Sequence, residues 1–419
     1  MDSPLAAGWQ CRVCGAFVDI SVPFTWTCPN ATESDRHHAL RLVQGATPLR
    51  AAGPKNPFLA YRPHLAWDGF VASHGLPAEE RDAMVNELDA LVAAVAGTGF
   101  VRTPLERADD LSTALGFGID GGVWVKDETG NVAGSHKARH LFTILLHLHA
   151  AQKMGLAEWT MRPPLAIASC GNAALAAATL AAAVSWPLQV FVPSSANLQV
   201  TKRLKELGAT VVECPRRAGD PAGDPCVHRF REAVAAGALP FTVQGPENAW
   251  CLDGGRTLGW ELAAHDFDRL FVQVGGGAFA ASVSEGLRMA GHTSMLRAVQ
   301  TEAAAPLARA WNLSRTLTPA EHWNECMWPW EHVGESAADG ILDDETYDWL
   351  PVVEAMSHSG GAPVVVTESH VLEANELGRR TTGIDVSHTG TAGLAGLLAI
   401  RDEVGPEERV AVVFSGLRR

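Results

Sequence analysis

Residues 165–183 read LAIASCGNAALAAATLAAA, an apolar run, a polar turn and an alanine-rich segment. Ser169, Gly171 and Asn172 interrupt the stretch, which therefore suits a buried strand, a turn and a buried helix better than a membrane span. The same order recurs along the chain, with strands expected at 122–126, 165–168, 188–192, 210–214, 269–274, 297–301, 363–367 and 410–414. Helices are expected between them, at 135–153, 172–183, 197–207, 230–236, 254–266, 278–290, 368–377 and 389–403, after a lead-in helix at 77–96. This alternation predicts an α/β fold with largely parallel sheets.

Ligands of such sheets bind at the carboxyl ends of strands, so the strand-to-helix turns are the expected sites of chemistry. In the first turn, Gly134-Ser135-His136-Lys137, the lysine lies in the first turn of an expected helix. Gly134 permits close backbone approach, and Ser135 is able to cap the helix or donate to an anion. An isolated lysine is usually a solvated side chain, but this context favours a ligand-binding role.

The second turn is Ser169-Cys170-Gly171-Asn172. Free amides at a helix N-terminus bind carboxylates, and an asparagine there is able to hydrogen-bond a phenolic oxygen. The alternative is an ordinary helix cap.

The third turn is Gly275-Gly276-Gly277-Ala278, between an apolar strand and a helix. Its amides are able to turn toward one phosphate. A dinucleotide fingerprint is absent, because Ala278, Phe279 and Ala280 follow the glycines.

Together these turns resemble the fold-type II family of pyridoxal 5'-phosphate (PLP) enzymes, which includes threonine synthase, serine and threonine dehydratases, diaminopropionate ammonia-lyase and the tryptophan synthase β subunit. The resemblance covers about residues 100–419. It rests on the order of five motifs: Lys-Asp-Glu at 126–128, Gly-Ser-His-Lys, Ser-x-Gly-Asn, the glycine loop and Ser-Gly at 415–416. Ala-Asp-Gly at 338–340 and Gly-Gly-Arg-Thr at 254–257 also fit. The resemblance implies an α/β fold with two parallel-sheet domains and a small N-terminal Cys-rich appendage.

The resemblance also implies roles for single residues. Lys137 would form the Schiff base with PLP and act as general base once substrate displaces it. The other implied cofactor ligands are Asn172 for the ring hydroxyl, Ser415 for the pyridine nitrogen, and Gly275, Gly276, Gly277 and Ala278 for the phosphate. Substrate contacts are expected from Ser135, Ser169, Cys170, Gly171 and Asp339. His136 is expected to pack beside the cofactor, and Glu302 either to lie near it or to cap a helix.

A serine opposite the ring nitrogen, unlike an aspartate, favours elimination over a long-lived carbanion. The first hypothesis is therefore β-elimination from a small β-substituted amino acid, giving a 2-oxo acid and ammonia. The second is a threonine synthase-like β- or γ-replacement, which the N-terminal Cys-x2-Cys-Gly supports. His136 and Ala138 depart from the threonine synthase pattern, and residues 248–251 lack its expected arginine. A third hypothesis is a metal-dependent interaction protein with a relic catalytic domain, which the joint presence of Lys137, Asn172 and the glycine loop disfavours.

The N-terminal cysteines form a separate candidate site. Cys11 and Cys14, followed by Cys28, have zinc-ribbon spacing for three ligands. His37 or His38 would complete a Cys3His zinc site, with His38 taken as the ligand. The alternative is a degenerate knuckle without metal.

Bulk properties restrict the partners of the chain. Its 419 residues carry a formal charge of −14, which disfavours binding to nucleic acid or to an anionic membrane and fits a small amino-acid substrate. The first residues show no basic and apolar signal pattern, so we expect a cytoplasmic protein with reduced thiols, and a homodimer by resemblance. The expected segments are 1–45, a Cys-rich appendage; 46–100, a helical lead-in; 101–138 with 241–419, a large PLP-binding domain; and 139–240, a small α/β domain.

Overall fold

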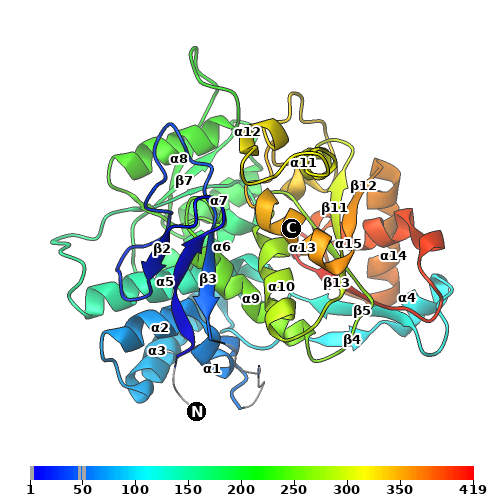
Figure 1. The fold of residues 1–419 in the computed structure, drawn as a ribbon, viewed down its shortest axis with the longest axis horizontal. Helices are drawn as coiled ribbons and strands as arrows, with labels where there is room; N and C mark the ends of the chain where they lie inside the picture. Colours follow the sequence, from blue (N-terminus) through cyan, green and yellow to red (C-terminus); the bar gives the residue numbers. More distant parts are fainter. Residues whose placement is uncertain (1–3, 46–48, 50–52) are drawn as a thin grey trace. The chain divides into compact units, whose positions relative to one another are not determined.

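The computed structural model describes residues 4–45, 49 and 53–419 (Figure 1). The chain forms two compact units. Unit 1 comprises Met1–Arg102, Asn131–Ala133 and Lys137–Thr257, and unit 2 comprises Thr103–Gly130, Gly134–His136 and Leu258–Arg419. The division into four segments made from the sequence stays a prediction; residues 1–3, 46–48 and 50–52, which fall in its first two segments, lie outside the described residues.

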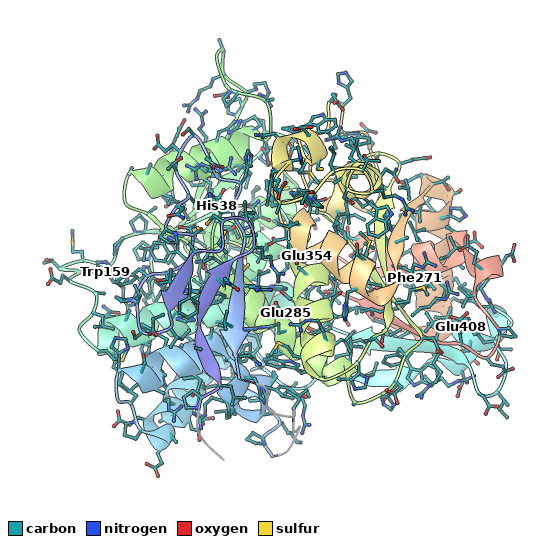
Figure 2. All side chains as sticks on the ribbon, in the orientation of Figure 1. His38, Trp159, Phe271, Glu285, Glu354 and Glu408 are labelled. Carbon is teal, nitrogen blue, oxygen red and sulfur yellow. The ribbon has the colours of Figure 1, made fainter. Side chains whose placement is uncertain are left out.

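Unit 2 is built on a six-stranded sheet of order β12-β11-β10-β13-β5-β4. All neighbouring strands are parallel except β4 and β5, which are antiparallel. The strands are β4 (Leu105–Arg107), β5 (Gly122–Asp127), β10 (Arg269–Gln273), β11 (Met295–Thr301), β12 (Ala362–Val366) and β13 (Arg409–Phe414). Phe271, labelled in Figure 2, is fully buried in the core formed by these strands and helices α14 (Glu368–Thr382) and α15 (His388–Ala399).

The other helices of unit 2 follow or precede its strands. They are α4 (Asp109–Ala114), α10 (Ala278–Met289), α11 (Pro306–Leu313), α12 (Trp323–Cys326) and α13 (Trp349–Ser359). Short 3-10 helices lie at η3 (Asp339–Ile341) and η4 (Arg401–Glu403). After Arg409, strand β13 consists of buried valine, alanine and phenylalanine, which is typical of a parallel sheet covered on both faces.

Unit 1 holds a second parallel sheet, of order β8-β7-β6-β9. Its strands are β6 (Leu165–Ala168), β7 (Leu188–Val192), β8 (Thr210–Glu213) and β9 (Leu239–Pro240). The helices in this part of the chain are α5 (Lys137–Lys153), α6 (Asn172–Ala183), α7 (Leu198–Glu206), α8 (Pro225–Ala235) and α9 (Trp250–Leu262), the last of which ends in unit 2. Two parallel sheets confirm the expected α/β fold.

The N-terminal part of unit 1 is a small antiparallel sheet of order β2-β1-β3, drawn in blue in Figure 1. Its strands are β1 (Ala6–Cys11), β2 (Phe17–Asp19) and β3 (Leu40–Gln44), and helices α1 (Pro57–Ala60), α2 (Ala66–Ser73) and α3 (Ala78–Ala96) follow. This sheet carries the cysteine cluster. Among the described residues, no helix combines the length and apolarity that crossing a bilayer requires.

Candidate cofactor site and cysteine cluster

The lysine turn is built from two consecutive left-handed residues. Ala133 has φ 56° and Gly134 has φ 74°, and α5 begins at Lys137 itself. Within unit 2, the carbonyl of Gly134 accepts a hydrogen bond from the N–H of Leu417 at 2.8 Å, and Ser135 is fully buried. The turn therefore has a defined conformation where Lys137, which is half-buried, leaves the backbone.

Helix α5 is hydrogen-bonded to the start of α9 inside unit 1. The Thr143 hydroxyl donates to the carbonyl of Trp250 at 2.8 Å, and His140 Nδ1 lies 2.8 Å from the carbonyl of Cys251. Burial and the charge of Lys137 lower the pKa of His140 to about 3, so its imidazole is neutral and Nδ1–H is the donor. These contacts fix the first turns of the helix that carries Lys137.

The serine turn lies between β6 and α6, as the sequence predicted. Asn172 is the first residue of α6, and the N–H of Gly171 lies 3.4 Å from the Ser169 hydroxyl. Ser169, Gly171 and Asn172 are half-buried and Cys170 is exposed. The twelve-residue helix α6 thus presents its positive N-terminal end next to these side chains.

The glycine loop joins β10 to α10, and its geometry requires glycine. Gly277 has φ 95°, and a Cβ there would lie 2.9 Å from Thr346 Cγ2. A Cβ at Gly275 would overlap the carboxylate of Asp343. The N–H of Asp348 donates to the Gly276 carbonyl at 2.8 Å, so this carbonyl is hydrogen-bonded within the protein. Because the loop leads straight into Ala278 at the start of α10, it fits a phosphate group.

Ser415 follows β13 directly and is held by His136. Its hydroxyl accepts the backbone N–H of His136 at 3.1 Å and lies 2.5 Å from His136 Nδ1. The His136 ring also stacks on Phe279, in the first turn of α10, at 3.9 Å between ring centres. Inside unit 2, His136 therefore links the expected pyridine-nitrogen partner to the helix that follows the glycine loop. The sequence predicted only that His136 packs beside the cofactor.

We expect His136→Ala to weaken PLP binding, because it removes a hydrogen bond of about 1 kcal/mol and an aromatic contact of about 1 kcal/mol. Together these losses correspond to roughly 30-fold in the dissociation constant. Titration of the apo form with PLP, followed by absorbance, measures this constant. His332→Ala, at an exposed histidine of the same unit, is the matched control. Equal affinities of the two variants would refute the linking role of His136.

The Lys-Asp-Glu strand end has a structural role within unit 2. The Lys126 ammonium, fully buried, donates to Glu261 Oε2 at 2.6 Å and to the Thr103 carbonyl at 2.5 Å. The Thr103 hydroxyl donates to Glu128, which is also buried. Lys126 pairs with Glu261, and Glu128 accepts from Thr103, so these side chains hold the segment around Thr103 in place.

Two further candidates lie elsewhere in unit 2. Asp339 is exposed in η3 and accepts a hydrogen bond from the Thr389 hydroxyl at 3.3 Å. Glu302 accepts the N–H of Glu368 at 3.4 Å, which supports its interpretation as a helix-capping carboxylate at the start of α14.

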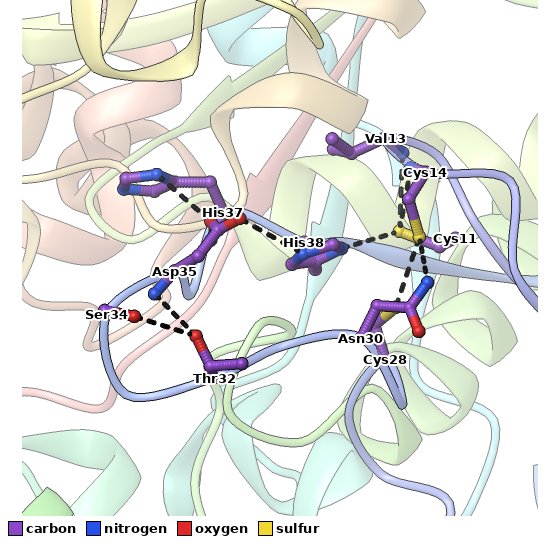
Figure 3. Close-up of polar contacts among 10 residues, drawn as sticks. All are labelled: Cys11, Val13, Cys14, Cys28, Asn30, Thr32, Ser34, Asp35, His37 and His38. Carbon is purple, nitrogen blue, oxygen red and sulfur yellow. Dashed lines mark hydrogen bonds and ion pairs between the residues drawn. The ribbon is translucent and has the colours of Figure 1, made fainter.

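The cysteine cluster is assembled as a potential four-ligand site (Figure 3). The ligand atoms of Cys11, Cys14, Cys28 and His38 all lie within 4.8 Å of one another. Cys14 Sγ and Cys28 Sγ are 3.5 Å apart, too far for a disulfide of about 2.05 Å. A tetrahedral zinc with bonds of about 2.3 Å to sulfur separates its ligands by about 3.7 Å. The four groups therefore fit zinc, and His38 rather than His37 is the histidine in the set.

Backbone and side-chain groups around the four candidate ligands hydrogen-bond or face them, as the groups that surround metal ligands do. The N–H groups of Val13 and Cys14 point to Cys11 Sγ at 3.4 and 3.5 Å, and Asn30 Nδ2 donates to Cys14 Sγ at 3.4 Å. His38 Nδ1 faces Cys11 Sγ at 3.3 Å, whereas its Nε2 lies 3.7 Å from Asp35. A histidine with a ligand group on one nitrogen and a carboxylate near the other is typical of metal sites.

A comparison with models of protein families decides the classification. The model described as "Pyridoxal-phosphate dependent enzyme" matches residues 96–416. The chain belongs to this family. PLP is therefore the cofactor that the family implies. The glycine loop between β10 and α10 is the candidate site for its phosphate.

Solved structures resemble this PLP-dependent enzyme in fold. A threonine deaminase from the organism abbreviated T.th. matches with a TM-score of 0.61 and 22% identity over 80% of this chain and 98% of its own. Maize serine racemase matches with a TM-score of 0.61 and 16% identity over 80% of this chain and 92% of its own. L-serine ammonia-lyase of the fungus Rhizomucor miehei matches with a TM-score of 0.57 and 19% identity over 76% of this chain and 94% of its own. No curated protein matches the chain. Identities this low carry the fold but not the reaction.

Proposed function

We propose that this enzyme is a PLP-dependent lyase that removes the β-substituent of a small polar amino acid and gives a 2-oxo acid and ammonia. The observation that carries the proposal is the neutral hydroxyl of Ser415, held by His136 at 3.1 and 2.5 Å. With the proton on His136 Nδ1, Ser415 accepts two hydrogen bonds and has its own O–H left to donate to the pyridine nitrogen. A hydroxyl leaves that nitrogen neutral, which favours rapid loss of a β-substituent over a long-lived carbanion.

The other proposed site residues each contact a different part of the cofactor. In the proposal, Lys137 would hold PLP covalently, Asn172 would hydrogen-bond its ring hydroxyl, and the amides of 275–278 would hold its phosphate. PLP, when bound, stabilises the electron pair left at the substrate α-carbon. The amine of Lys137, released by the incoming substrate, takes the α-proton. For serine, the Cα–H and Cβ–O bonds break, water leaves, and hydrolysis of the remaining enamine gives pyruvate and ammonia.

Recognition of the substrate carboxylate is assigned to the turn before α6. Ser169, Cys170 and Gly171 precede a twelve-residue helix whose N-terminal amides favour an anion. Ser135 and Asp339 are the further proposed substrate contacts. The similarity in fold to a threonine deaminase and to an L-serine ammonia-lyase supports this reaction class.

A substrate panel tests the proposed reaction. We expect PLP-loaded enzyme to release ammonia and a 2-oxo acid from at least one of serine, threonine, diaminopropionate and cysteine, measured by a coupled dehydrogenase assay and mass spectrometry. The matched control is alanine, which has no leaving group. A new amino acid formed only when a thiol or amine is added would instead support the replacement reaction. Activity with none of the four substrates would contradict the lyase assignment.

We also propose that Cys11, Cys14, Cys28 and His38 bind a structural zinc ion. The mutual distances of their ligand atoms and the carboxylate of Asp35 beside His38 support this assignment.

A further inference from the structure

The loop before Cys28 connects the cysteine cluster to the body of unit 1. The Trp26 carbonyl accepts the backbone N–H of Ala249 at 2.8 Å, and the Trp26 ring packs edge-on against Trp250 at 5.5 Å between ring centres. Phe24 in the same loop packs on Trp159, which Figure 2 labels, at 5.8 Å. The loop thus contacts both the segment that begins α9 and a second aromatic residue of unit 1.

This loop has a conformation that its neighbours must maintain. Phe24 has φ 58°, a left-handed conformation that costs a bulky residue roughly 1–3 kcal/mol. Such residues persist only where the surrounding structure fixes the chain. The packing of Phe24 on Trp159 fixes one end of the loop, and a metal bound to Cys28 would fix the other.

Trp250 in turn contacts the lysine helix along one face. Its carbonyl accepts the hydroxyl of Thr143 at 2.8 Å, and its ring stacks on His147 at 4.1 Å with an interplanar angle of 12°. His147 is buried, and within the described part of the chain neither of its ring nitrogens has a hydrogen-bond partner. Stacking on Trp250 therefore orients the His147 ring.

Helices α5 and α9 lie so close together that position 254 of α9 has no room for a side chain. A Cβ at Gly254 would overlap the carbonyl oxygen of Arg139, and the Gly254 N–H donates to Thr143 Oγ1 at 3.1 Å. Because α5 begins at Lys137, a shift of the first turns of α9 would move the turns of α5 that directly follow the lysine.

We propose that Zn²⁺ bound to Cys11, Cys14, Cys28 and His38 positions Lys137, by holding Trp26 against Trp250 and thereby fixing α9 against α5. The path consists of contacts inside unit 1 from the metal ligand to the lysine helix. The inference rests on the proposed role of Lys137 in binding PLP. Zinc has no role in the reaction itself; it acts on the alignment of the helix.

The experiment uses the full chain and five proteins: wild type, Cys28→Ser, His38→Ala, His37→Ala and Trp26→Ala. Zinc per chain is measured by atomic emission, and the PLP dissociation constant by absorbance titration of the apo form. His37→Ala is the matched control for His38→Ala, because His37 lies outside the ligand set. Trp26→Ala breaks the contact but leaves every proposed ligand in place.

We expect zinc in wild type, His37→Ala and Trp26→Ala, and its loss in Cys28→Ser and His38→Ala. PLP binding should weaken about tenfold in both ligand variants and in Trp26→Ala, within the roughly 5- to 150-fold range of typical coupling between sites. Hydrogen exchange of residues 247–254 should accelerate in the same three proteins. Zinc-free variants with wild-type exchange and PLP affinity would overturn the inference, and so would a Trp26→Ala protein with unchanged affinity.

Two measurements keep the test decisive if a variant does not fold or the proposed function fails. Wild-type protein stripped of zinc by a chelator repeats the comparison without any substitution, and restored zinc should restore both readouts. Exchange of residues 247–254 is measured on protein without PLP, so this readout does not depend on the cofactor. If wild-type protein takes up no PLP at Lys137, the proposed function fails; if residues 247–254 do not respond to zinc, the positioning role fails.

Discussion

Lys137→Ala should lose the covalent link to PLP and lower kcat/KM for the best substrate by about 10³-fold or more, because one amine serves as both attachment point and base. The visible absorption band of the lysine-bound cofactor should disappear, while the apo fold should remain. The substitution removes a half-buried side chain at the first residue of α5 and breaks no helix hydrogen bond.

The matched control is Lys153→Ala, at the exposed C-terminal end of the same helix. It should keep the absorption band and the wild-type rate. Persistence of the band in Lys137→Ala would show that PLP is attached elsewhere, and it would remove the basis of the proposed site.

Gly277→Ala should weaken PLP binding by roughly 10- to 100-fold, the second large effect that we expect. The residue has φ 95°, and an added Cβ would lie 2.9 Å from Thr346 Cγ2, so the loop must shift. Left-handed backbone with a Cβ costs about 1–2 kcal/mol, and the shift also displaces the amides that bind phosphate. Absorbance titration of the apo variant with PLP measures the change.

Gly291→Ala is the matched control, because Gly291 has φ 85° with no atom within 4 Å of its added Cβ among the described residues. Both substitutions carry the strain of a left-handed alanine, but only Gly277 lies in the glycine loop. The thermal midpoint of the apo protein should fall in both variants, and further in Gly277→Ala because its added Cβ also meets Thr346. A Gly291→Ala protein that loses as much PLP affinity as Gly277→Ala would show that general destabilisation explains both.

The parallel sheets were predictable because their strands are short apolar runs next to turns. The predicted strands at 165–168 and 188–192 and the helix at 172–183 agree with β6, β7 and α6. Helix α9 was predicted to begin at Gly254, which was interpreted as the start of a Gly-x-x-Thr helix motif, but it begins at Trp250. In the structure the missing side chain at Gly254 instead permits contact with the Arg139 carbonyl.

Some helices begin with capping residues that the predicted helix bounds did not take into account. Helix α8 begins at Pro225 after an Asp224 cap that accepts the N–H of Cys226, an arrangement typical of helix starts. Helix α13 was not predicted, although Pro351 lies in its first turn, where proline is tolerated. The strands of the N-terminal sheet lack a regular alternation of apolar and polar residues, so no pattern indicated them.

Only those features of the candidate site that lie within a few consecutive residues could be predicted from the sequence. Turns such as Ser169–Asn172 are adjacent in sequence, and motif order identified them. The link between His136 and Ser415 joins residues that are 279 positions apart, and spacing alone contains no sign of it. His38 was taken from the sequence as the histidine ligand, and the structure groups it, rather than His37, with the three cysteines. The expected homodimer and the roles of the single site residues stay predictions.

The most direct test of the central claim is to load the wild-type chain with PLP, reduce the complex with borohydride, and map the modified lysine by peptide mass spectrometry. We expect a single phosphopyridoxyl group, on the peptide that contains Lys137. Lys126, the nearest lysine before it in the chain, should be unmodified because its ammonium is buried against Glu261. Modification of a lysine other than Lys137, or none at all, would contradict the account.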